Sequence, residues 1–529
     1  MFRLPCMVFG KLYHYNACFL KPFHIRFNFS TQEDNTKFLC KYLKISESKA
    51  QYLQMKHPII KKLDSDQIKD LADTLYDLGF QRNILLNEPS LCSILPITLK
   101  YRFNVLKECG VHNISTQHLV SYLTLVKQKT IGTLKQSGII PHLLNIENRL
   151  ASYMTQWPSS LTTLVYGNVN DFTLHSLRIK IIQRYLELML DLSPDEFKRG
   201  LHTYPTIRHR PLQSINETLT ILQSEILMPI PKLKSNLYLV HADPENLKNI
   251  LYNFRSIGGI DMKEIIRMHP KLALIKYQTL LEIRKIFEEY GISKEAQIKC
   301  FQIYTLSPAT IKDRLEKAKS IPEFNAFYGH PRFLKMIHYN KTALKRLMKL
   351  YSNNKKCLSL NILSGSSAHY ETFEKAPGDR LGKGKDLVFC ITKSLGTSFN
   401  TSNVRSLIKR HPFWINIPLI QVKYVYEQLS ANFSANDIYE NCPILLYPWN
   451  KIRETINLLD KKLIKNPNLQ HYEQIDLTLL SKSQKLSLVL YLLEKKHYFT
   501  GNGVWSEEKK KNIVDFSPNS NVVDNISVI

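Results

Sequence analysis

Residues 268–293 read MHPKLALIKYQTLLEIRKIFEEYGIS, and in this stretch Pro270 is followed 21 positions later by Gly291. A proline costs nothing at the first turn of a helix, because the N–H that it lacks would have no partner there. A glycine just past the end of a helix adopts the left-handed conformation without a steric penalty. The stretch therefore predicts a helix that Pro270 opens and Gly291 closes, with Ser293 as the cap of the next helix.

The same spacing recurs along the chain. It joins Pro58 to Gly79 and Pro89 to Gly110, and further prolines that mark corners are Pro308, Pro331, Pro412 and Pro443. Apolar residues recur every three or four positions between these markers, so one face of each helix is expected to pack against a neighbour. Units of roughly 31 to 38 residues built in this way predict an all-α fold, a superhelical solenoid of stacked helix-turn-helix repeats.

Composition favours a binding protein with a polyanionic partner. The chain has 529 residues, and 72 Lys and Arg stand against 45 Asp and Glu, which gives a formal charge of +27. A balance this basic is typical of nucleic-acid binding.

The nine cysteines form no C-x-x-C pair, so we expect reduced, packed thiols and no metal site. No phosphate-binding loop or catalytic motif is present, and the run LGKGK at 381–385 lacks the required spacing. We therefore expect no cofactor and no enzymatic activity.

Changes of composition predict the boundaries of the parts. Residues 1–30 carry four Lys and Arg and no acidic residue, which is typical of a mitochondrial transit peptide; a basic arm that stays on the protein is the alternative. Helical repeats are expected at 38–352 and 386–505, with a flexible insertion at 353–385 and a disordered tail at 506–529. No stretch is apolar enough to span a bilayer.

Basic residues gather near the corners of the predicted repeats. The candidates for nucleic-acid binding are Arg208, Arg210, Arg267, Lys271, Lys312, Arg314, Arg332, Lys335, Lys409, Arg410, Lys451 and Arg453. On a curved solenoid, cations that recur once per repeat would form a track along a duplex, which carries one phosphate charge per ~1.7 Å. For any one of them, a solvated helix face is the structural alternative.

These repeats, with their proline corners, leucine-rich helices closing on Gly-Ile-Ser, basic balance and presequence, resemble the mitochondrial transcription termination factor (mTERF) family. The C-terminal runs 484–494 (QKLSLVLYLLE) and 499–505 (FTGNGVW) are similar to the end of that family's domain. The resemblance covers about residues 50–505 and is nearest to a longer form of the family found in insects. It implies a curved half-ring whose basic concave face lies along double-stranded mitochondrial DNA in the matrix, associated with the nucleoid, to regulate or terminate transcription. It also implies a paralogue or the mitochondrial transcription machinery as partner.

Two other functions stay open from the sequence alone. One is an RNA-binding solenoid that acts on mitochondrial ribosomal RNA or in ribosome assembly, since basic helical repeats bind structured RNA as well as DNA. The other is a protein-interaction scaffold of stacked helices on which the positive charge is only a solvated surface.

Overall fold

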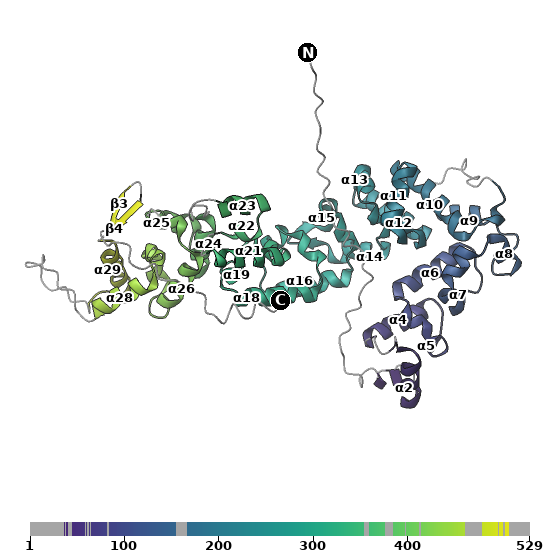
Figure 1. The fold of residues 1–529 in the computed structure, drawn as a ribbon, viewed down its shortest axis with the longest axis horizontal. Coiled ribbons are helices and arrows are strands. Elements are labelled where there is room, and N and C mark those ends of the chain that lie inside the picture. Colours follow the sequence, from purple (N-terminus) through teal and green to yellow (C-terminus); the bar gives the residue numbers. More distant parts are fainter. Residues whose placement is uncertain are drawn as a thin grey trace, which may run out of the picture. The chain divides into compact units, whose positions relative to one another are not determined.

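The structure, a computed structural model, describes residues 36–37, 39–40, 45–58, 60, 63, 65–81, 84–154, 167–353, 359–375, 384–396, 398–411, 414–460, 479–495, 497–500 and 503–506. The predicted transit peptide at 1–30, Pro412 and the predicted tail beyond residue 506 lie outside these residues. The chain divides into two compact units, Met1–Ser224 with Met228–His241 and Glu225–Leu227 with Ala242–Ile529. Each unit consists mainly of helices that follow one another in chain order (Figure 1).

The first unit contains α-helices joined by short 3-10 helices and by the π-helix η2. In chain order they are α2 (Glu47–Lys56), α4 (Ser65–Asp77), α5 (Ile84–Asn87), η1 (Pro89–Ser93), α6 (Pro96–Glu108), α7 (Thr116–Val120), η2 (Thr124–Gln128), α8 (Ile131–Gln136), α9 (Ile146–Ala151), η4 (Val169–Asp171), α10 (Leu174–Leu190), α11 (Pro194–Thr203), η5 (Pro205–His209), α12 (Leu212–Thr220), α13 (Ile230–Ser235) and η7 (Leu237–His241). A further π-helix, η6 (Ile221–Glu225), continues α12.

The second unit repeats this arrangement and adds two short β-hairpins. Its elements are α14 (Pro244–Asn249), the π-helix η8 (Ile250–Phe254), β1 (Ser256–Ile257), β2 (Ile260–Asp261), α15 (Met262–Met268), η9 (Pro270–Leu274), α16 (Tyr277–Glu289), α17 (Lys294–Ile298), η10 (Phe301–Thr305), α18 (Pro308–Ser320), α19 (Pro322–Ala326), α20 (Phe333–His338), α21 (Asn340–Ser352), α22 (Leu360–Ser364), α23 (Ser367–Lys375), α24 (Gly384–Leu395), α25 (Thr401–Ile408), η11 (Trp414–Asn416), α26 (Leu419–Leu429), α27 (Ala435–Glu440), η12 (Cys442–Leu446), α28 (Trp449–Asp460), α29 (Lys482–Glu494), β3 (His497–Thr500) and β4 (Gly503–Ser506). Both hairpins are antiparallel.

A repeat consists of a short α-helix, a 3-10 helix and a long α-helix, as in α15–η9–α16 and α17–η10–α18. The long helices α12, α14 (which η8 continues), α16, α18 and α21 begin at Leu212, Pro244, Tyr277, Pro308 and Asn340. Their starts are evenly spaced, with one repeat taking about 32 positions, which is a length typical of helical repeat proteins. Within the second unit, α14 packs on α16, α16 on α18, α24 on α26 and α26 on α28. The predicted all-α repeat fold is confirmed.

The core of each repeat is anchored at the same position. In the long helices from α4 to α28, the fourth residue is apolar and buried: Ile68, Leu99, Leu177, Ile215, Leu247, Leu280, Ile311, Ala343, Leu387, Val422 and Ile452. Burying one leucine, isoleucine or valine side chain stabilises the fold by about 1.5–3 kcal/mol, so this position ties each repeat to the stack.

The prediction of one helix between each proline and its glycine is wrong. Pro270 opens the short 3-10 helix η9, Ile275 is extended, and α16 starts anew at Tyr277. The reason lies in the previous repeat, where the Asn246 side chain donates to the Ile275 carbonyl at 2.9 Å and accepts from the Tyr277 N–H at 2.8 Å. This amide binds the backbone groups that a continuous helix would pair internally.

The prediction that a glycine ends each of these helices is confirmed. Gly291 has φ +62°, and Gly79 and Gly110 have φ +91° and +79° after α4 and α6. These values lie in the left-handed region that ends helices. Ser293 also caps α17 as predicted, because its hydroxyl accepts from the Ala296 N–H.

The prolines mark two different positions of the repeat. Pro89, Pro270 and Pro443 lie in the first two residues of 3-10 helices, whereas Pro308 is the first residue of the long helix α18 and Pro331 lies in the turn before α20. Pro270 and Pro308 therefore occupy different positions of their repeats. For this reason the number of residues between them is larger than the length of one repeat.

The loop expected within 353–385 is wrong for residues 360–375. They form α22 and α23, which bury Leu360, Ile362, Leu363 and Phe373. The segment is polar overall, so its few apolar residues did not indicate helices in the sequence. In the structure, α22 packs on α20, α21 and α23. The boundaries of the predicted repeat blocks at 38–352 and 386–505 stay predictions.

A buried ion pair joins helices of the first unit. Arg178 on α10 is 0% exposed and its Nη1 donates to Glu108 Oε2 on α6 at 2.9 Å; Glu108 is 3% exposed. The carboxylate also accepts from the backbone N–H groups of Leu212 and Gln213, at 2.9 and 3.0 Å, and so caps α12. Arg178 Nη2 donates to the Arg210 carbonyl. Three helices and the corner between η5 and α12 therefore meet at one pair.

Candidate nucleic-acid interface

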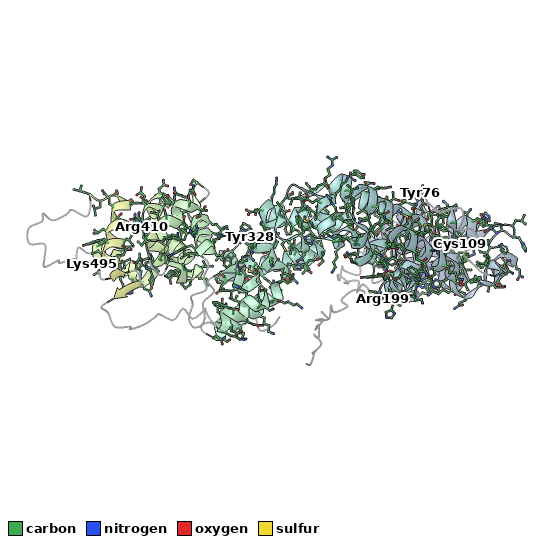
Figure 2. All side chains as sticks on the ribbon, turned by 90° about the horizontal axis from the view of Figure 1, so that it is seen from above. Tyr76, Cys109, Arg199, Tyr328, Arg410 and Lys495 are labelled. Carbon is green, nitrogen blue, oxygen red and sulfur yellow. The ribbon has the colours of Figure 1, made fainter. Side chains whose placement is uncertain are left out.

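The twelve predicted cations divide by exposure. Seven are exposed and all of these belong to the second unit: Arg267, Lys271, Lys312, Lys409, Arg410, Lys451 and Arg453. Arg410 is labelled among the side chains in Figure 2. The other five, Arg208, Arg210, Arg314, Arg332 and Lys335, are half-buried. Exposure alone makes the first group better placed to reach a phosphate.

Two half-buried arginines are already bound within the protein. Arg210 donates to the His241 carbonyl, and its guanidinium lies 4.1 Å from the centre of the Tyr101 ring. Arg314 Nη1 donates to the carbonyls of Ile337 and His338, at 2.9 and 2.7 Å. These bonds satisfy carbonyls at helix ends, which have no intrahelical donors. Arg210 and Arg314 are therefore weaker candidates for phosphate contacts.

Two further arginines, which sequence reasoning missed, have the same role. Arg284 Nη2 donates to the carbonyls of Phe254 and Ser256 at 2.9 and 2.8 Å. Arg346 is 7% exposed, and its Nη1 donates to the Gly365 carbonyl at 2.8 Å. Arg314 and Arg346 are both the seventh residue of their long helices, so alignment of the repeats would have identified this structural role.

A cation recurs just before the second helix of successive repeats. Arg267, Lys299, Arg332 and Arg410 lie shortly before the starts of η9, η10, α20 and η11. The first three follow one another at the spacing of one repeat. Lys299 is exposed and was missed, because its repeat has no proline at this corner. Cations at helix C-termini are also favoured by the helix dipole, which is the structural explanation for part of the pattern.

Arg208 lies close enough to His175 to interact electrostatically with it, in a basic cluster of the first unit that also includes Lys127 and Arg178. The rings of His175 and His209 stack at 5.5 Å, and His209 Nδ1 lies 3.2 Å from the Tyr122 hydroxyl. Burial, with His175 and Lys127 adding to it, lowers the pKa of His209 to about 4. The imidazole is therefore neutral at pH 7, and the positive charge of the cluster comes from its lysine and arginine side chains.

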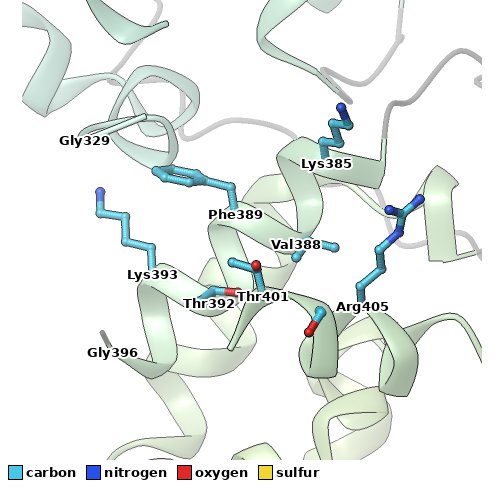
Figure 3. Close-up of a pocket in the computed structure, with 10 residues that line it drawn as sticks. Gly329, Lys385, Val388, Phe389, Thr392, Lys393, Gly396, Thr401 and Arg405 are labelled. Atoms are coloured by element: carbon cyan, nitrogen blue, oxygen red, sulfur yellow. The ribbon is translucent and has the colours of Figure 1, made fainter. Parts of the chain in front are cut away.

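A pocket of about 680 Å³ opens in the second unit beside α24 and the start of α25 (Figure 3). Lys385, Phe389 and Lys393 on α24 and Arg405 on α25 line it; in Figure 3 the Phe389 and Lys393 side chains extend toward Gly329, and those of Lys385 and Arg405 lie on the other side of the pocket. Its remaining lining includes Thr392, whose hydroxyl is buried and has no hydrogen-bond partner. No carboxylate is among the lining side chains described. The pocket thus offers cations, hydrogen-bond donors and one aromatic ring.

Two other kinds of site do not occur in the described part of the chain. Among the residues that the structure describes, no three His, Cys, Asp or Glu side chains gather as a metal ion would require. Over the same ranges, no helix combines the length and the apolar character needed to cross a bilayer.

Comparison with known proteins relates the chain to a curated protein. No family model and no solved structure matches the chain. The curated protein, mitochondrial transcription termination factor 5 of Drosophila melanogaster, is 32% identical over 489 residues, which cover 91% of this chain and 85% of the relative. The match confirms the resemblance that the repeat pattern indicated. At this identity and coverage, the chain belongs to the mitochondrial transcription termination factor family.

Proposed function

We propose that this protein binds double-stranded mitochondrial DNA through the exposed corner cations of its second unit, and in this way regulates or terminates transcription of the organellar genome. The observation that carries the proposal is the recurrence of a cation at the corners of its repeats, where Arg267, Lys299 and Arg410 are exposed and Arg332 is half-buried. The name of the relative, a mitochondrial transcription termination factor, supports the same process and compartment.

Physical chemistry favours phosphate contacts for these residues. Arg267, Lys299 and Arg410 are exposed, and none of them forms an ion pair with a carboxylate in the described ranges of the chain. Binding a phosphate then requires no internal ion pair to break. Each cation that neutralises a phosphate releases a condensed counterion, so affinity falls as salt rises.

The test is fluorescence anisotropy with a labelled duplex across salt concentrations of about 50–200 mM. If six to eight phosphates are neutralised, the slope of log K against log salt is expected to be about −5 to −7. Charge reversal by Arg267→Glu with Arg410→Glu should weaken binding to all sequences alike and make the slope shallower by about 2. Lys345→Glu, at an exposed lysine in the middle of α21, is the control for a single charge reversal, half the change in net charge of the double variant.

Three results would contradict the proposal. A slope shallower than about −2 would show that the cations do not form the binding surface. Tighter binding to structured RNA than to duplex DNA would favour the RNA-binding alternative. A loss of binding free energy in the Lys345→Glu control that is half of the loss in the double variant would mean that net charge, and not the corner positions, determines binding.

A further inference from the structure

The pocket beside α24 and α25 has a charge that no lining carboxylate balances. Three cations, Lys385, Lys393 and Arg405, line it. Lys393 also donates to the Tyr328 carbonyl, a neutral group that leaves its charge in place. The adjacent Asp386 is engaged elsewhere, because it accepts from the Leu360 N–H at 2.8 Å and lies 3.5 Å from His330 Nε2. Three cations around one cavity favour an anion with more than one negative charge.

The other lining groups indicate that the anion carries a ring. Phe389 forms part of the wall, and its orientation is fixed by His330, whose ring meets it edge-on at 4.7 Å. Val388 adds a second apolar surface. Thr392 also lines the pocket, and its buried hydroxyl lacks a hydrogen-bond partner. Flat aromatic groups stack on phenylalanine, and their heteroatoms accept hydrogen bonds.

The volume of the pocket limits the size of the ligand that it can bind. A volume of about 680 Å³ lies in the range of about 300–1,000 Å³ that is usual for sites that bury a small organic ligand. An inorganic anion would leave most of this space, and the Phe389 wall, without a contact. A ligand with a phosphate chain at one end and a heteroaromatic ring at the other matches both parts of the lining.

We propose that this pocket binds a free nucleoside phosphate, with the phosphates held by Lys385, Lys393 and Arg405 and the ring placed against Phe389. The site goes beyond the proposed DNA contacts and uses none of the corner cations. It would give the protein a response to the concentration of a nucleotide.

Isothermal titration calorimetry of the full chain tests this proposal with ATP, AMP, adenosine and inorganic phosphate. ATP is expected to bind most tightly, and adenosine and inorganic phosphate at least about 10-fold more weakly, because each reaches only one part of the lining. Lys385→Ala with Arg405→Ala should weaken ATP binding about 10- to 100-fold, which is the loss expected for charge-assisted hydrogen bonds. Phe389→Leu should weaken ATP but leave inorganic phosphate unchanged.

The controls separate this site from the DNA surface. Lys345→Ala removes an exposed cation outside the pocket and should leave ATP binding unchanged. Circular dichroism checks that each variant is folded. Absence of saturable ATP binding at millimolar concentration, or equal loss in Lys345→Ala, overturns the proposal. Anisotropy with duplex DNA runs in parallel, so a protein that binds DNA but not ATP loses only this inference.

Discussion

Replacement of Glu108 tests whether the first unit depends on the buried ion pair. The carboxylate balances Arg178, which is 0% exposed, and also accepts from the N–H groups of Leu212 and Gln213. Glu108→Ala removes all three bonds at once. A buried charge left without its partner costs about 3–5 kcal/mol, and each orphaned N–H adds about 1 kcal/mol or more.

We therefore expect Glu108→Ala to lower the free energy of unfolding of the first unit by about 5–7 kcal/mol, a large part of the roughly 5–15 kcal/mol typical of a domain. Glu108→Gln keeps an acceptor for the backbone N–H groups but removes the charge. It should therefore lower the free energy of unfolding less than Glu108→Ala does. Arg178→Met should also cost less than Glu108→Ala, because the carboxylate then still accepts from two N–H groups.

The assay is hydrogen exchange with mass spectrometry across guanidinium chloride concentrations, read on peptides of α10 and α12. These peptides report the first unit separately from the second. The double variant Glu108→Ala with Arg178→Met should lose less than the sum of the two single changes, by about 2 kcal/mol or more. Asp195→Asn is the control, since its 4.0 Å contact with Lys198 is exposed and should contribute little. A loss below about 1 kcal/mol in Glu108→Ala, or simple additivity in the double variant, would refute the reasoning.

Two further predictions concern pH and a helix end. Burial lowers the pKa of His209 and of His241 to about 4, below the value of about 6.5 expected in an unfolded chain, so the unfolded state binds more protons between these values. The urea midpoint of the first unit should therefore fall as pH drops from about 6.5 towards 4, and His241→Gln should reduce this fall; a midpoint independent of pH would contradict the assignment. At Gly291, with φ +62° and open space where a Cβ would lie, Gly291→Ala should cost about 1 kcal/mol and Gly291→Asn less, as measured by thermal unfolding; equal stability of the three proteins would exclude a left-handed helix end.

The sequence predicted the repeats better than it predicted their internal division. Proline and glycine have local conformational preferences, so Pro270 and Gly291 could be placed from the chain alone. A proline suits the first turn of either helix, however, and nothing local distinguishes Pro270 in a 3-10 helix from Pro308 in a long α-helix. The break between η9 and α16 depends on Asn246, which lies one repeat earlier. A contact between two repeats, such as this one, can be identified only once the stacked structure is known.

The candidate interface shows a similar limit. A positive charge near a corner can be read from the sequence, but its partner cannot, and Arg314 proved to be bonded to two carbonyls. Lys299 is the opposite case, an exposed corner cation that was not predicted. The corners were located by their prolines, and the corner before η10 has no proline. The even spacing of the long helices, once established, identifies both residues by their place in the repeat.

The formal charge of +27 therefore overstates the charge available to a nucleic acid. Arg178, Arg210, Arg284, Arg314 and Arg346 each donate to a carbonyl or carboxylate of the protein itself. Such a guanidinium would have to break these bonds before it could neutralise a phosphate, so its counterion release should contribute little to the salt dependence. The seven exposed candidates and Lys299 together correspond to a slope of about −7, at the steep end of the range expected for the duplex. A measured slope that agrees with this smaller set would match the number of exposed corner cations, and the charge-reversal variants then test their positions, whereas a much steeper slope would require cations outside the repeat corners.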